Sequence, residues 1–275
     1  MKKRKALRDQ YEMAQVRPKT VLLWTALRSI STAFERSIIT LSNVKVIHEP
    51  FDDVFYLGPE RQSNRYASRP IKTDQTYKEA GRKITKEYEG KEVVFSKNMA
   101  HYVENKFEMF LEPQYKCTQH TFLVRNPEES IPALYRASKD PKIVSAGWNY
   151  FDPEEAGFRQ MYELYHFIVE NVHPSPVLID ADDLLDHPDE TMKTYCDAVG
   201  ITYQSHMTSW EPGPVAEYAH CAGLWHQNVI KSYGFNAKKT KADDCTMPDE
   251  VRKAITDAKP YYEFLKAKKL KINIY

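Results

Sequence analysis

Short apolar runs rich in β-branched residues recur along the chain and alternate with segments of helical periodicity. Five runs predict buried strands, at residues 20–24, 44–47, 92–96, 121–124 and 176–179. After the first run, Phe34, Ile38 and Leu41 fall on one face of a helix predicted over 32–41. The order strand, loop, helix, strand is typical of a doubly wound βαβ unit, so we predict an α/β fold around a parallel sheet.

Further helices are predicted at residues 74–89, 99–111, 127–137, 152–172, 188–199 and 248–268, and loops at 50–73 and 202–247. Gly200 is expected to end the helix that precedes it. Pro260 is expected to break or kink the last helix. Because no repeat or composition break divides the chain, we expect one domain over 19–275, after a flexible basic tail over 1–18.

Composition and charge narrow the class of protein. The chain has 275 residues, with 39 Lys and Arg against 38 Asp and Glu, which gives a formal charge of +1. This near neutrality argues against binding to nucleic acid, because a duplex-DNA binder needs a net basic surface. No apolar core follows the basic N-terminus, so we do not expect a secretory signal. Residues 21–24 are far too few to span a bilayer, so no membrane association is expected.

The cysteines indicate the cellular compartment. The four of them are widely spaced and form no CxxC pair, which fits a reduced, cytoplasmic protein. Cys117 and His120 form a CxxH pair, but no second pair has metal-ligand spacing. We therefore expect no metal site.

The segment between the first strand and the first helix is the most informative one. There the first helical N–H groups and the helix dipole favour an anion. Arg28 adds a planar cation that can fork onto phosphate or sulfate oxygens. Ser29, Ser31 and Thr32 add hydroxyl donors. These residues either form a phosphate cradle without glycine or are an ordinary N-cap beside a surface arginine.

A second basic residue follows another strand. Arg125 ends the fourth predicted strand, and ligands of open α/β sheets collect at the carboxyl ends of strands. Its guanidinium can meet a second phosphate of the same nucleotide there. The alternative is a salt bridge to Glu128 or Glu129.

Taken together, these segments resemble the sulfotransferase family, whose donor is 3′-phosphoadenosine 5′-phosphosulfate. Residues 28–32 resemble the family's 5′-phosphosulfate loop, and Arg125-Asn-Pro with the segment 133–136 resembles its 3′-phosphate motif. Residues 178–188 resemble a further family segment, and the whole resemblance runs from about residue 21 to 235. It implies a three-layer α/β sandwich of the P-loop NTPase-like type, with a central parallel sheet, and a small-molecule acceptor.

The resemblance also implies which residues bind the donor: Arg28, Ser29, Ile30, Ser31, Thr32, Arg125, Ser130 and Trp225. Two of these positions depart from the family pattern. Ile30 stands where glycine is usual, and a β-branched residue does not readily take a positive φ. The loop is therefore expected either to avoid that conformation or to bind differently. Ala133 stands where a phosphate-binding serine is expected, and Ser130, one helical turn earlier, is expected to substitute.

Sulfuryl transfer needs donors on the developing charge and a base for the acceptor's proton. We assign Arg28 to stabilising the transition state and the leaving group, helped by Ser31, Thr32 and Lys97. No metal is required, since these groups can neutralise the leaving group.

The base has three candidates. Glu49 and His101 follow the second and third strands at the same sheet edge, and we favour them jointly. A histidine at such a position can titrate near neutrality. His48 is the third candidate, and each of the three has a purely structural alternative.

The loop over 56–66 combines aromatic residues with two arginines. Long loops in compact domains are often lids, so we predict substrate contacts from Arg61, Arg65 and Tyr66, and also from His48. A polar or anionic acceptor would suit them. The alternative is a disordered surface loop.

Two other functions compete with sulfuryl transfer to a hydroxyl or amine. One is a small-molecule kinase or other nucleotide enzyme on the same scaffold, with Asp182 or Asp183 as the only candidates for a Mg²⁺ carboxylate. The absence of a GxxxxGK[ST] loop argues against it. The other is a catalytically silent nucleotide-binding protein, suggested by Ile30 and Ala133.

Overall fold

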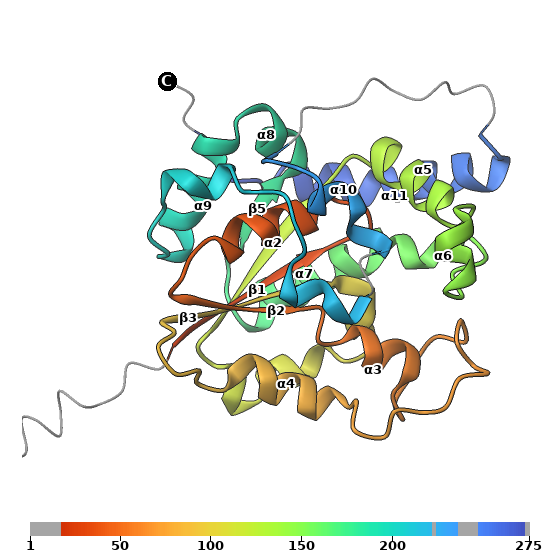
Figure 1. Cartoon of the computed structure of the whole chain (residues 1–275), viewed down its shortest axis with the longest axis horizontal. Coiled ribbons are helices and arrows are strands. Elements are labelled where there is room, and N and C mark those ends of the chain that lie inside the picture. The colour runs from red at the N-terminus through yellow and green to blue at the C-terminus, as the bar shows by residue number, and fades with distance from the viewer. Residues whose placement is uncertain (1–17, 222–223, 236–246, 273–275) are drawn as a thin grey trace, which may run out of the picture.

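The central element is a five-stranded parallel sheet with the strand order β2-β3-β1-β4-β5 (Figure 1). The computed structural model describes residues 18–221, 224–235 and 247–272. The strands are β1 (Lys19–Thr25), β2 (Val44–His48), β3 (Val93–Met99), β4 (Thr118–Val124) and β5 (Val177–Asp180). The predicted α/β class with a central parallel sheet is therefore confirmed. The predicted tail lies outside the described residues, except for Pro18.

The helices of the described residues are α2 (Ser31–Ile39), α3 (Asp52–Leu57), α4 (Tyr77–Thr85), α5 (Pro127–Ala137), α6 (Pro141–Ser145), α7 (Phe158–Asn171), α8 (Ala181–Asp186), α9 (Pro188–Val199), α10 (Gln227–Ile230) and α11 (Asp249–Lys266). As predicted, α9 ends at Gly200, which takes a left-handed φ of 65°. Helix α11 continues through Pro260, so the expected break does not occur. Pro260 is exposed, and water can satisfy the carbonyl that the proline leaves unbonded. None of the helices in the described ranges is long and apolar enough to cross a membrane.

Two segments differ from the prediction. The expected loop over 50–73 contains α3, whose first turn carries Asp52 and Asp53 where the helix dipole favours acidic side chains. The expected helix over 99–111 is instead two 3₁₀ turns, Ala100–Val103 and Phe107–Leu111. Asn105 lies between them with a φ of 59°, which a right-handed helix cannot contain.

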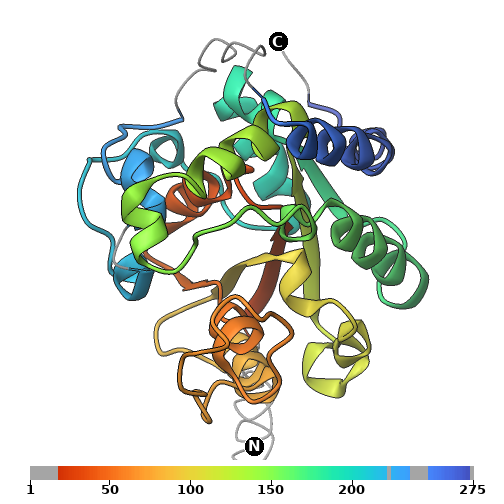
Figure 2. The same cartoon turned by 90° about the vertical axis from the view of Figure 1, so that its right-hand side faces the viewer.

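Helices cover both faces of the sheet, which makes three layers (Figure 2). Side chains alternate along a strand, so Val21 and Leu23 of β1 point to one face while Leu22 and Trp24 point to the other. The first face packs under α2, α8 and α9, and the second under α3, α4, α5, α7 and α11. Because β1 is buried on both faces, its sequence is a continuous apolar run.

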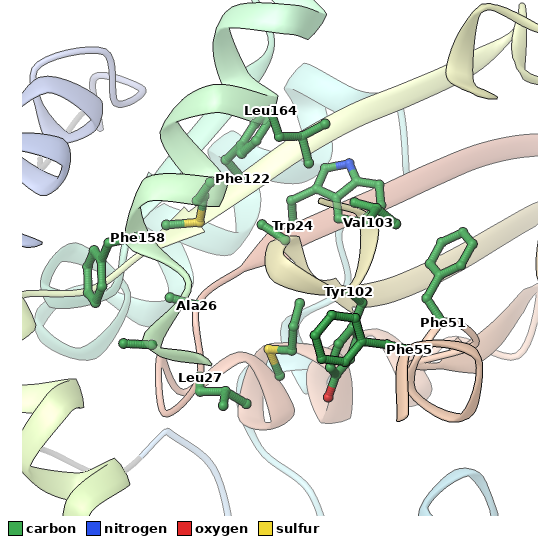
Figure 3. Close-up of a cluster of buried hydrophobic side chains, with 14 of the residues drawn as sticks. Trp24, Ala26, Leu27, Phe51, Phe55, Tyr102, Val103, Phe122, Phe158 and Leu164 are labelled. Atoms are coloured by element: carbon green, nitrogen blue, oxygen red, sulfur yellow. The ribbon is translucent and has the colours of Figure 1, made fainter. Parts of the chain in front are cut away.

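Trp24 anchors the second face (Figure 3). It is fully buried, and its indole N–H donates to Nδ1 of His120 at 3.0 Å. The His120 ring also stacks parallel to the indole. To accept this bond Nδ1 must be unprotonated, and burial lowers the pKa of His120 to about 3. His120 is therefore neutral in the folded protein.

This buried histidine predicts a specific acid sensitivity. An unfolded histidine titrates near its ordinary pKa of 6.5 whereas folded His120 titrates at about 3, so the unfolded chain takes up a proton first as pH falls. Stability is then lost from about 6.5 downward to about 3, at ~1.4 kcal/mol per pH unit. His120→Gln removes this titrating group, so the unfolding free energy should fall less steeply with decreasing pH, by ~1.4 kcal/mol per pH unit. Urea denaturation at several pH values between about 6.5 and 3 measures this slope. His206→Gln, at an exposed position, is the control. Equal slopes in the two variants would contradict the prediction.

Candidate active site

A cavity of about 560 Å³ opens where β1 and β4 end side by side. The strand order changes direction here, because the chain goes from β1 first to β2 and β3 on one side and then to β4 and β5 on the other. Such a switch point is where open α/β sheets bind ligands. The loop 27–33 after β1 forms one wall of the cavity, and Arg125, directly after β4, reaches into it.

The loop after β1 has an unusual backbone. Arg28 and Ile30 have φ angles of 63° and 58°, in the left-handed region, and Ile30 is the N-cap of α2. The loop therefore does not avoid the conformation that a β-branched residue disfavours, at a cost of about 1–2 kcal/mol. The carbonyl of Ile30 accepts the N–H groups of Ala33 and Phe34, which fixes the start of the helix. Strained backbone in a loop that lines a cavity is typical of a functional site.

Two arginines lie close together at this wall. Nη1 of Arg125 donates to the carbonyl oxygen of Arg28 at 2.9 Å, and Nη1 of Arg28 is 3.4 Å from the carbonyl oxygen of Trp225. Burial, and then the positive charges of Arg125 and Arg136, lower the pKa of Arg28. Burial likewise lowers the pKa of Arg125, although Glu129 lies 3.7 Å away. An anion between the two guanidinium groups would relieve both effects.

Several polar atoms at this wall have no hydrogen-bond partner among the described residues. They include Oγ of Ser29 and Nε of Arg125. Thr32 and Ser31 also line the cavity, and Oγ1 of Thr32 is 3.4 Å from Nδ1 of His226. Buried polar groups are normally satisfied, so these atoms indicate a ligand with acceptor oxygens.

The opposite wall carries carboxylates. Glu49 follows β2 with a φ of 41° and forms an ion pair with Lys97, while Tyr102 donates its hydroxyl to Oε2 of Glu49 at 3.0 Å. Burial would raise the pKa of Glu49, but the charges of Lys97 and His48 outweigh it and hold the pKa well below its usual range. Glu49 is therefore a fixed carboxylate.

Lys97 and His48 lie beneath this wall and are not among the residues that line the cavity. The Lys97 side chain is fully buried against Glu49. Nδ1 of His48 is 2.7 Å from Oε2 of the buried Glu35, and its Nε2 is 3.6 Å from Oε1 of Glu49. The structure therefore places both residues in contact with Glu49 rather than at the cavity surface, where the sequence analysis expected them.

His101 is not at the cavity either. The 3₁₀ turn after β3 directs Tyr102 to the cavity, and His101 packs against Phe55 behind it. Neither ring nitrogen of His101 has a hydrogen-bond partner among the described residues, and burial lowers its pKa to about 3. Figure 3 shows Phe55 and Tyr102 side by side in the buried cluster, with ring centroids 5.5 Å apart.

Ser130 also differs from the expectation. Its buried hydroxyl donates to the carbonyl oxygen of Asn126 at 3.3 Å, the back-bond that serine makes within a helix. Ala133 lines the cavity and Ser130 does not. The structure thus brings Arg125 to the cavity without the predicted hydroxyl.

The comparison with known families decides what kind of domain this is. A family model described as "Sulfotransferase domain" matches residues 19–269. The chain belongs to the sulfotransferase domain family.

Relatives of this sulfotransferase domain are distant. "Branched-chain-amino-acid aminotransferase-like protein 2" of Arabidopsis thaliana is 27% identical over 222 residues, which are 78% of this chain and 36% of that protein. "Sulfotransferase ppzF" of Metarhizium majus is 25% identical over 179 residues, 55% of this chain and 52% of that protein. The chain thus spans about a third to a half of the length of the curated relatives that it matches.

Solved structures support the fold. A sulfotransferase from Alicyclobacillus acidocaldarius superposes with a TM-score of 0.51 and 13% identity, over 92% of this chain and 95% of that one. The sulfotransferase domain from the curacin biosynthetic pathway has a TM-score of 0.50 and 13% identity, over 88% of this chain and 98% of that one. The expected P-loop-like sulfotransferase fold is therefore confirmed.

In this sulfotransferase domain, aromatic side chains also line the cavity, in addition to the loop after β1. They are Tyr56, Tyr66, Tyr102, Trp148 and Trp225. Trp148 is both buried and in the cavity wall. Asp52, His226 and Tyr102 were not predicted as site residues. Asp52 was not predicted because residues 50–73 were expected to form a loop. In the structure Asp52 begins helix α3, close enough to Glu49 for the two charges to interact.

The predicted lid is attached to the body of the domain at Arg65. The guanidinium lies between the rings of Trp148 and Tyr150, with its central carbon 3.8 and 3.9 Å from their centroids. Nε donates to Oε1 of Glu155 at 2.9 Å, and Nη2 pairs with Oε2. Arg65 is buried and does not line the cavity, and neither does Arg61, whereas Tyr66 does. Arg65 therefore holds the loop rather than facing the cavity.

This ion pair predicts a large loss of stability on truncation. Arg65→Ala leaves the buried carboxylate of Glu155 without its cation, which should cost about 3–5 kcal/mol of unfolding free energy in chemical denaturation. Arg82→Ala is the matched control, because Arg82 forms an exposed pair with Glu79 at 2.9 Å and should cost less than about 1 kcal/mol. Similar losses in the two variants would refute the anchoring role of Arg65.

Proposed function

We propose that this domain transfers a sulfuryl group from 3′-phosphoadenosine 5′-phosphosulfate to a hydroxyl or amine of a small-molecule acceptor. The observation that carries the proposal is the pair Arg28 and Arg125 at one wall of the cavity, with a fixed carboxylate at the other. Membership in the sulfotransferase domain family supports the same reaction class.

The residues after β1 and β4 fit such a donor. The unpartnered Oγ of Ser29 and Nε of Arg125 offer hydrogen bonds to phosphate oxygens. We assign the 5′-phosphosulfate to the loop 28–32 and the 3′-phosphate to Arg125. Trp225 holds its backbone carbonyl against Arg28 and presents its ring to the same cavity.

The donor, when bound, supplies an activated sulfuryl group and a bisphosphate leaving group. Arg28 stabilises the charge that develops on the sulfuryl and bridging oxygens, and the hydroxyls of Ser31 and Thr32 add hydrogen bonds to it. Lys97 acts through Glu49, since its ammonium group is buried against that carboxylate.

The kinase alternative finds less support. It requires a carboxylate for Mg²⁺, and the two that the sequence offered, Asp182 and Asp183, do not line the cavity. Asp183 is instead paired with Lys269 at 2.6 Å. Of the carboxylates that do line the cavity, Glu49 and Asp53 are paired with Lys97 and Lys72. Arg28 and Arg125 bring positive charge to the cavity beside the loop after β1, which suits an anionic donor bound without a metal.

The aromatic wall bears on the acceptor. Four rings, those of Tyr56, Tyr66, Tyr102 and Trp148, line the cavity beyond the arginines. Aromatic side chains bury apolar surface and stack on other rings. We therefore propose an acceptor with an aromatic or apolar body that directs its hydroxyl or amine toward the carboxylates.

Donor binding can be tested without knowing the acceptor. Titration calorimetry with 3′-phosphoadenosine 5′-phosphate should show binding in the absence of Mg²⁺. Arg28→Ala and Arg125→Ala should each weaken it about 10- to 100-fold, because each loses hydrogen bonds to a charged group. Lys253→Ala, at an exposed pair with Asp257, should bind like the wild type. Unchanged affinity in both arginine variants would overturn the site, and a preference for Mg-ATP would favour a kinase.

The missing phosphate-binding serine can be restored. Ala133→Ser places a hydroxyl at the cavity beside Arg125 and should tighten binding of 3′-phosphoadenosine 5′-phosphate by up to about tenfold, measured by the same calorimetry. Ser130→Ala should leave the affinity unchanged, since its hydroxyl is used inside α5. A loss of affinity in Ser130→Ala with none gained in Ala133→Ser would show that Ser130 serves the donor after all.

A further inference from the structure

Asp52 is a carboxylate at the cavity wall, three residues after Glu49. It stands in the first turn of α3, is partly exposed, and lines the cavity together with Tyr56 and Tyr102. Its backbone N–H donates to the carbonyl oxygen of Glu49 at 3.0 Å, so the turn between β2 and α3 fixes its place.

The three candidate bases that the sequence suggested are unsuited to receive the acceptor's proton. His48 does not line the cavity, and its Nδ1 is 2.7 Å from Oε2 of the buried Glu35. Both carboxylate oxygens of Glu49 are engaged, Oε1 by Lys97 and Oε2 by the Tyr102 hydroxyl. His101 is packed behind the cavity wall. The lysines nearest to Asp52 form ion pairs with its neighbours: the ammonium group of Lys97 pairs with Glu49, and Lys72 pairs with Asp53 at 2.8 Å.

The groups around Asp52 set its charge. Glu49 and Asp53 come from its own segment, Tyr56 from the same helix, Tyr66 from the following loop, Tyr102 from the turn after β3 and Lys97 from β3 itself. Burial first, then the charges of Glu49 and Asp53, raise the pKa of Asp52 to about 7, against a hydrogen bond with Tyr102 and the charge of Lys97. A carboxyl group that titrates near neutrality suits general base catalysis.

We propose that Asp52 is the catalytic residue that takes the proton from the acceptor's hydroxyl or amine. This role rests on the proposed sulfuryl transfer. The acceptor's oxygen or nitrogen forms a bond to sulfur while its proton passes to the Asp52 carboxylate. The bond between sulfur and the bridging oxygen breaks, and its electron pair leaves with the bisphosphate. Asp52 then releases the proton to solvent through the cavity.

Glu49 is on this account a positioning residue. It keeps a negative charge next to Asp52 and accepts a hydrogen bond from the hydroxyl of Tyr102, whose side chain lines the cavity together with Asp52. Removing that charge by Glu49→Gln should lower the pKa of Asp52 without removing the base.

The charge state of Asp52 can be measured without an acceptor. Infrared difference spectroscopy over a pH titration should show one carboxyl group with a midpoint near neutrality that is absent in Asp52→Asn and shifted to lower pH in Glu49→Gln. Asp74→Asn, at an exposed loop position outside the cavity, should keep the signal. A carboxyl signal of Asp52 that ionises at about 4, the ordinary value, would overturn the proposal.

The catalytic role needs acceptors of different acidity. With sulfur-labelled donor, Asp52→Asn should lower kcat for phenol by about 100-fold or more and abolish the acid limb of the pH profile. It should lower kcat far less for 4-nitrophenol, which is mostly ionised at mildly alkaline pH and needs no base. Affinity for 3′-phosphoadenosine 5′-phosphate should stay within about twofold of the wild type, which shows that the variant is folded.

The outcomes separate this assignment from the proposed function. A wild-type protein that neither binds the bisphosphate nor transfers sulfuryl groups would overturn both. Transfer that survives Asp52→Asn with its acid limb intact would overturn only the role of Asp52. Equal loss with both phenols would assign Asp52 a structural role instead.

Discussion

The ion pair between Lys97 and Glu49 is the contact on which the carboxylate wall of the cavity depends. Lys97 lies in the middle of the sheet and its side chain is fully buried, so its charge requires a partner at short range. Glu49 supplies it only by leaving β2 with a positive φ, while its backbone N–H bonds the carbonyl of Lys97. The carbonyl of Glu49 then receives the N–H of Asp52, and α3 starts. One buried charge thus determines where the next helix begins.

The wall that carries Arg28 and Arg125 is built differently, because its charges are not neutralised by a close ion pair. Arg28 and Arg125 are brought together by the ends of neighbouring strands. Arg125 donates to the backbone of Arg28 at 2.9 Å and also forms a longer ion pair with Glu129 at 3.7 Å, as the sequence suggested. Their contact leaves positive charge and unpartnered donors at the cavity, and the strained φ of Ile30 maintains the loop that presents them. Backbone strain and unsatisfied polar groups make this loop less stable, but they also preorganise its hydrogen-bond donors for an anion.

The sequence predicted well those features that depend on local pattern or on strand ends. Buried parallel strands are continuous apolar runs, so their positions can be predicted from the sequence. The residues that follow such strands converge on one edge of the sheet, which is why Arg28, Glu49 and Arg125 can be predicted to share a site. It could not predict which way a short turn faces. A 3₁₀ turn in place of a helix after β3 puts Tyr102 at the cavity and His101 behind it. Ser130 satisfies its hydroxyl within its own helix, a choice that spacing alone does not reveal. Asp52 was missed because compensation of charge is a tertiary property: only the folded chain shows that Lys97 goes to Glu49.

The two halves of the cavity are also coupled electrostatically. A donor with phosphate and sulfate groups brings negative charge into the cavity that contains Asp52, and such charge disfavours the ionised form of a carboxyl group. On the proposed assignment, Arg28 and Arg125 would lie next to the donor and would offset its charge. Their positive charge would then limit how far a bound polyanion raises the pKa of Asp52.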